Sequence, residues 1–184
     1  MKILSCFTII LYLCTTLMGS SDKQHKERMK TELILVGKTT DKHFLAGIDD
    51  YVGRIAHYMP FGITIIPELK STKSLTEEQQ KTTEGRLILA QLQPSDTVVL
   101  LDEHGVEMRS VELARWLERK QATAKRLVFV VGGPYGFSQE VYGRANDKLS
   151  LSKLTFSHQM VRLVFVEQIY RACTIIKGEP YHHE

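Results

Sequence analysis

The side chains best suited to chemistry gather in the last third of the chain. The loop GGPYGF at 132–137 has three glycines within five residues, which let a backbone approach a ligand and present bare amide groups. The dinucleotide pattern G-x-G-x-x-G and the P-loop lysine pattern are both absent, so phosphate binding is not supported. From the residues alone, a ligand-binding loop and a simple turn are equally good interpretations.

Arg162 is the second candidate, because it falls on an apolar helix face. At about 100° per residue, the helix expected over 158–177 places Glu167, Arg171 and Thr174 on a polar side. The opposite side holds Phe165, Val166, Ile169, Cys173 and Ile176, with Arg162 among them. A core-facing arginine is rare unless an anion or several acceptors meet it. It either forms an internal salt bridge, snorkels to solvent, or points into a site that binds phosphate or a developing anion.

Other kinds of site have little support. His182 and His183 are adjacent, but no third ligand lies nearby and no H-x-x-x-H or C-x-x-C spacing occurs. The G-x-S-x-G pattern of a serine nucleophile is also missing. We therefore expect neither a metal site nor a catalytic serine triad.

Alternating strand and helix signals predict the scaffold that positions these residues. Apolar runs predict strands over 31–37, 61–68, 96–102 and 126–131. Helical spacing predicts helices over 41–59, from a Ser74–Glu77 capping box to about 92, after a Ser110 cap, near 139–147, and over 158–177 with Gly178 at its end. Apolar strands separated by helices are typical of an α/β fold with a mostly parallel sheet flanked by helices.

Such a sheet also predicts where a ligand binds. Ligands of parallel sheets lie beyond the carboxyl ends of the strands, which indicates the loops after Leu101 and Val131. No repeat or linker interrupts the segment 29–184, so we expect a single domain there.

Residues 1–28 differ from the rest of the chain. Lys2 precedes an apolar run to Met18 and then small residues, the layout of a signal-like leader. This segment carries four basic and two acidic residues, +2 of the net charge of +3. Without it, Cys173 is the one cysteine left, which cannot form an intrachain disulfide. Our hypothesis is that residues 1–28 are a mis-called upstream extension and that Met29 is the initiator.

Two segments carry a resemblance to a known family. VVGGPYGF and LSLSKLTFSHQMVRLVFVEQIYRACTIIKGEPYHHE resemble the RlmH family of ribosomal RNA methyltransferases, and the likeness extends to MKTELILVGK at Met29. It implies a SPOUT-class fold with a trefoil knot near the C-terminus, a homodimer, and S-adenosylmethionine as methyl donor. The implied reaction is methylation at N3 of a pseudouridine in large-subunit (23S) ribosomal RNA, in the cytoplasm.

The resemblance also implies site residues. Those expected to line the cofactor site are Leu101, Gly132, Leu151, Ser152, Lys153, Leu154, Thr155 and Phe156. Candidates for RNA positioning and proton handling are His158, Arg162, Tyr170, Arg171, Tyr181 and His182, with the general base unassigned. Histidine suits the proton role because it titrates near neutral pH; a structural hydrogen bond is the alternative for His158.

The chain departs from the family pattern at two positions, and two rival functions stay open. Family members often have proline where this chain has Ser157, and a basic residue where it has His183. Taken at face value, the leader favours an exported, non-enzymatic α/β binding domain, which would meet neither ribosomal RNA nor S-adenosylmethionine. The other rival is a SPOUT methyltransferase that acts on a different RNA.

Overall fold

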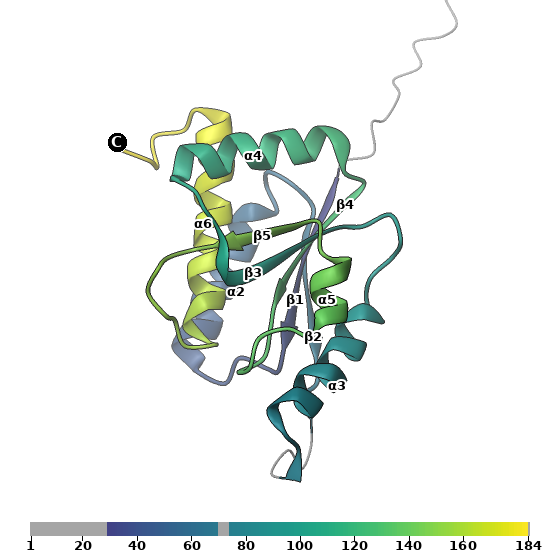
Figure 1. The fold of residues 1–184 in the computed structure, drawn as a ribbon. Coiled ribbons are helices and arrows are strands. Elements are labelled where there is room, and N and C mark those ends of the chain that lie inside the picture. Colours follow the sequence, from purple (N-terminus) through teal and green to yellow (C-terminus); the bar gives the residue numbers. More distant parts are fainter. Residues whose placement is uncertain (1–28, 70–73, 184) are drawn as a thin grey trace, which may run out of the picture.

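A five-stranded parallel sheet forms the centre of the fold (Figure 1). The computed structural model describes residues 29–69 and 74–183, so the expected leader at 1–28 lies outside the described residues. The strands are β1 (Lys30–Val36), β2 (Phe61–Ile66), β3 (Thr97–Glu107), β4 (Arg126–Val131) and β5 (Asp147–Ser150), in the order β2-β1-β4-β3-β5. All four neighbouring pairs are parallel, which confirms the predicted sheet.

Five helices of the described residues cover both faces of the sheet. They are α2 (Lys42–Ile55), α3 (Glu77–Leu89), α4 (Ser110–Thr123), α5 (Gln139–Arg144) and α6 (Met160–Lys177). Successive strand residues point to opposite faces, so Leu33 and Leu35 pack with α2, α4 and α6, whereas Ile34 and Val36 pack with α3 and α5. The central strands are apolar on both sides because each side meets a helical layer.

Two predicted helix starts are wrong. The capping box of α3 is Thr76 with Gln79, not Ser74 with Glu77: Gln79 N donates to Thr76 Oγ1 at 3.2 Å, and Thr76 N donates to Gln79 Oε1 at 2.9 Å. Both pairs have the required spacing, but the box forms where the first helical turn begins. Ser110 is the first residue of α4 rather than its cap.

The chain from β3 to β5 departs most from expectation. β3 continues to Glu107, and its pairing with β5 shifts between Leu101 and Val106. β5 was not predicted, because its four residues of mixed polarity, DKLS, carry no strand periodicity. The trefoil knot implied by the resemblance stays a prediction, since strand order does not establish how the chain is threaded.

The last helix follows the predicted faces with one exception. Phe165, Val166, Ile169 and Cys173 are buried as expected, and Gly178 ends the helix with a φ of +69°. The exception is Thr174, which is buried. Its hydroxyl tolerates burial because it donates a hydrogen bond to the carbonyl of Arg171 at 2.8 Å. Burial raises the pKa of the free thiol of Cys173 to about 12. Within residues 29–69 and 74–183, no helix is long and apolar enough to cross a membrane.

Candidate functional site

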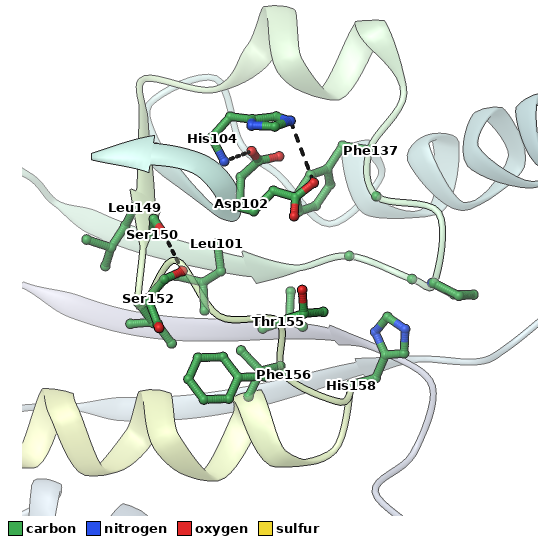
Figure 2. Close-up of a pocket in the computed structure, with 18 of the residues that line it drawn as sticks. Leu101, Asp102, His104, Phe137, Leu149, Ser150, Ser152, Thr155, Phe156 and His158 are labelled. Atoms are coloured by element: carbon green, nitrogen blue, oxygen red, sulfur yellow. Dashed lines mark hydrogen bonds and ion pairs between the residues drawn. The ribbon is translucent and has the colours of Figure 1, made fainter. Parts of the chain in front are cut away.

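A cavity of about 470 Å³ opens at the carboxyl ends of β3, β4 and β5 (Figure 2). Its walls are residues 101–104 of β3, the glycine loop after Val131, and the loop after Ser150 that leads into α6. This is the end of the sheet at which ligands of parallel α/β folds bind. The volume lies within the range of about 300–1,000 Å³ found for small-molecule sites.

The cavity brings together seven of the eight residues expected to bind a cofactor. Figure 2 shows Leu101 of β3 and three residues of the β5–α6 loop, Ser152, Thr155 and Phe156, around one space. The lining residues are Leu101, Gly132, Leu151, Ser152, Leu154, Thr155 and Phe156. Lys153 belongs to the same loop, but it is not among the residues that line the cavity.

The glycine loop is both a turn and a wall of this cavity. The amide of Gly136 donates to the carbonyl of Gly133 at 3.1 Å, and Gly136 has a φ of +80°, which favours glycine. A Cβ at Gly132 would lie 3.1 Å from the ring of Phe137, so the backbone passes close to that ring. The two interpretations of GGPYGF are therefore compatible.

Asp102 and Tyr142 line the cavity and were missed by the sequence analysis. The Tyr142 hydroxyl donates to Asp102 Oδ2 at 2.5 Å, and the amide of His104 donates to Asp102 Oδ1 at 2.8 Å. Burial, together with the Asp102 carboxylate, raises the pKa of Tyr142 to about 12. Asp102 is the last residue of the strand predicted over 96–102, which was the available signal. Tyr142 joins the site only through the packing of α5.

The loop from β5 to α6 is held by its own serines. Ser150 Oγ donates to the carbonyl of Ser152 at 3.1 Å, and Ser152 Oγ accepts from the amide of Leu154 at 2.9 Å. Ser157 Oγ accepts from the amide of Met160 at 3.2 Å. Serine in place of the family's proline thus supplies a hydrogen bond to the first turn of α6.

Arg162 is buried and meets backbone acceptors rather than an anion. Nη2 donates to the carbonyl of Val36 at 2.7 Å, and Nη1 donates to the carbonyl of Gly37 and to Thr39 Oγ1, both at 3.0 Å. Burial lowers the pKa of its guanidinium. No carboxylate of the described chain pairs with it. Arg162 therefore fixes the end of β1 to α6.

His158 lies between two cavities. It lines the 470 Å³ cavity and also a neighbouring one of about 340 Å³, which Arg162 lines as well. Gly133 and Pro134 of the glycine loop separate the two spaces and line both. The structure thus places His158 where a group could act on molecules bound on either side of this loop.

The other four candidates lie in the second half of α6 or beyond its C-terminal end. This helix has 18 residues, so about 27 Å separates its ends. Tyr181 stacks edge-on against Tyr170 at 4.8 Å between ring centroids, and Arg171 lies over the Tyr181 ring. The Tyr181 hydroxyl donates to Glu167 at 3.1 Å. Figure 1 shows the C-terminal tail beyond the C-terminal end of α6, so one chain does not bring it to the cavity.

In the described residues, no group of three or more histidine, cysteine, aspartate or glutamate side chains is arranged to hold a metal ion. The cavity combines apolar side chains with hydroxyl, carboxylate and main-chain groups. Sites of this kind orient small molecules through a few placed polar contacts.

Comparisons with known proteins indicate the same family along the described chain. A family model described as "Predicted SPOUT methyltransferase" matches residues 29–182. A Bacteroides fragilis protein named Ribosomal RNA large subunit methyltransferase H is 64% identical over 157 residues, covering 85% of this chain and 100% of that protein. Proteins of the same name from Bacteroides thetaiotaomicron and Porphyromonas gingivalis are 60% and 51% identical, each over 157 residues with the same coverage.

Proposed function

The chain belongs to the SPOUT methyltransferase family, and on this basis we propose that it methylates N3 of a pseudouridine in large-subunit ribosomal RNA, with S-adenosylmethionine as donor. The proposal rests on the match to relatives named Ribosomal RNA large subunit methyltransferase H, which covers 100% of their length and 85% of this chain. The cavity at the carboxyl ends of β3, β4 and β5 supports it, because it provides a site of suitable size and chemistry in the expected place.

The residues around the 470 Å³ cavity fit an uncharged nucleoside joined to an amino acid. Leu101, Leu149 and Leu151 offer apolar surface to a flat ring, and Asp102 offers a carboxylate to hydroxyl or amino groups. The glycine loop offers main-chain groups without side-chain obstruction. Bound there, S-adenosylmethionine supplies a methyl group on a sulfonium.

The protein's own work is to align the acceptor nitrogen and remove its proton. Alignment alone contributes up to about 7–11 kcal/mol to lowering a barrier. As the methyl group bonds to N3, the N3 proton has to leave to a nearby base or to water. His158 is our candidate for this proton, because it borders both cavities and histidine exchanges protons near neutral pH.

We assign the tail to the cavity of a partner subunit. Tyr181 and His182 lie beyond the far end of α6, and Tyr170 and Arg171 lie about 15 Å along the helix from its start, so none of them is placed to act on the cavity of its own chain. A homodimer with the two chains oppositely directed would bring one chain's tail to the other's cavity. Arg171 and the tail would then position the RNA, with Arg171 suited to phosphate. The expected place of work is the cytoplasm, where ribosomal RNA and the donor occur together.

The proposed function predicts two separate measurements. Isothermal calorimetry of the purified protein should show binding of S-adenosylmethionine, and mass analysis of 23S RNA from a deletion strain should show loss of the methylpseudouridine. Absence of binding would reject the methyltransferase and favour a binding domain. Binding with persistence of the modified base would instead assign the enzyme to another RNA.

The tail assignment predicts a loss of activity without a loss of donor binding. Replacing Tyr181 by alanine removes its contacts with Tyr170 and Glu167 and releases the tail. Methyl transfer should fall roughly tenfold or more, because positioning is lost, while the dissociation constant for S-adenosylmethionine stays unchanged. His183→Ala is the matched control, since His183 is exposed in the same tail. Unchanged transfer by Tyr181→Ala would remove the tail from the site.

A further inference from the structure

The 340 Å³ cavity behind the glycine loop has no part in donor binding as proposed above. Its walls come from the β1–α2 loop with Lys38, from Glu68 after β2, from Gln80 and Glu84 of α3, and from Arg162 of α6. It adjoins the donor cavity across Gly133, and His158 borders both. A molecule held here would therefore lie beside the bound donor.

Glu84 is the most unusual group in this wall. It lies on α3, and the residue is only 4% exposed. Its Oε1 accepts from Gln80 Nε2 at 2.8 Å, whereas its Oε2 is buried and has no hydrogen-bond partner among the described residues. Burial raises the pKa of Glu84 despite the hydrogen bond from Gln80. A buried acceptor without a donor is destabilising, so a ligand N–H is a suitable partner for it.

Gly133 explains how this carboxylate comes so close to the donor cavity. A Cβ at Gly133 would lie only 2.2 Å from Glu84 Oε2, so the carboxylate packs against the bare backbone of the glycine loop. The last torsion of a glutamate side chain is broad, and a small rotation presents Oε2 to the cavity. The unpartnered oxygen thus lies at the boundary between the two spaces.

Arg162 supplies the complementary group from another wall. It is 3% exposed, and its two terminal nitrogens donate to backbone carbonyls at the end of β1. Its Nε is buried and unpartnered in the described chain. One cavity therefore has a hydrogen-bond acceptor and a hydrogen-bond donor to offer, which is the complement of an N–H beside a C=O on a pyrimidine ring.

The charges around the cavity favour a neutral ligand over a phosphate. Lys38 and Arg162 bring positive charge, but Glu68 and Glu84 bring two carboxylates. A phosphate would lie near both carboxylates, and like charges repel strongly in a partly buried site. A neutral nucleobase meets no such repulsion and uses both kinds of hydrogen bond.

We propose that this cavity receives the acceptor base, and that Glu84 selects pseudouridine over uridine by accepting a hydrogen bond from its N1–H. The inference rests on the proposed function. Pseudouridine is joined to its sugar through carbon, so its N1 carries a hydrogen where uridine presents a C–H. Recognition at N1 leaves N3 free to face the methyl donor. Uridine in the same place would leave Glu84 unpaired, and sites built to hydrogen-bond an N–H reject analogues without it.

The test compares Glu84→Met with the wild-type protein on ribosomes that carry either pseudouridine or uridine at the target. Single-turnover rates with enzyme in excess make slow uridine methylation measurable. Methionine removes the acceptor at similar size, so the rate on pseudouridine should fall roughly tenfold or more. The rate on uridine should stay the same, so the preference collapses. Glu84→Gln keeps a neutral acceptor and should therefore retain part of the preference for pseudouridine.

Controls separate this role from a structural one. The dissociation constant for S-adenosylmethionine should not change in Glu84→Met, and Glu78→Met on the exposed side of α3 should keep the full preference. Equal losses on both substrates, or no loss on pseudouridine, would overturn the assignment of Glu84. A wild-type protein that methylates neither kind of ribosome would instead contradict the proposed function itself.

Discussion

Replacing Arg162 by alanine is expected to abolish methyl transfer and to destabilise the fold, while the proposed dimer is retained. The substitution leaves the carbonyls of Val36 and Gly37 without their donor in a buried place. Each unpaired buried carbonyl costs about 1–3 kcal/mol. The β1–α2 loop loses its tie to α6, and the wall of the smaller cavity is displaced. Denaturant unfolding, light scattering and methyl-transfer assays measure the three effects.

Arg162→Lys distinguishes the geometry of the guanidinium from its charge. Lysine keeps the charge but is a single point donor, so it cannot reproduce the fork that reaches both carbonyls and Thr39. We expect intermediate stability and little methyl transfer. Arg86→Ala, on the exposed surface of α3, is the control and should behave as the wild type. If dimerisation is lost, Arg162 holds the subunit interface instead.

Replacing Gly105 by alanine is expected to disrupt the donor cavity from the edge of the sheet. A Cβ at Gly105 would lie 2.5 Å from the carbonyl carbon of Leu149 and 2.7 Å from the amide nitrogen of Ser150. These are backbone atoms and cannot rotate away, so β5 has to separate from β3. Overpacking of this kind costs about 1–3 kcal/mol. Leu149 and Ser150 both line the cavity, so calorimetry should show affinity for S-adenosylmethionine reduced roughly tenfold or more.

Gly62→Ala is the matched control for this prediction. Gly62 is also in a strand, β2, but a Cβ there would have no neighbour within 4 Å. Its φ is not positive, so alanine should be neutral or stabilising. A gain would amount to about 0.4–1 kcal/mol, because alanine reduces the conformational freedom of the unfolded chain. Wild-type donor affinity in Gly105→Ala would show that β5 does not shape the donor site.

The predictions from sequence succeeded where a pattern is local and repeated. Apolar runs and helical spacing predicted β1, β2, β4 and α6 to within a few residues, because burial on both faces leaves a continuous apolar signal. The rule for strand ends then placed the site beyond Leu101 and Val131, where the cavity lies. The apolar pattern did not predict β5, whose four residues owe their strand conformation to pairing with β3.

The chemistry of individual side chains required the tertiary structure. Helical spacing placed Arg162 in the core, but only the fold showed that its partners are carbonyls 125 and 126 residues away in sequence. Glu84 lies in a polar helix and has no distinctive local signal; its burial follows from the packing of α3 behind the glycine loop.

The sequence by itself determined the α/β class, the parallel sheet, the end of the sheet that carries the site, and the family resemblance. These follow from side-chain polarity and residue order, which are properties of the chain read along its length. The tertiary structure alone decided which polar groups share a cavity, which lack partners, and that the tail lies far from its own chain's site. Those relations depend on contacts between residues distant in sequence, where a small shift of one helix changes every distance.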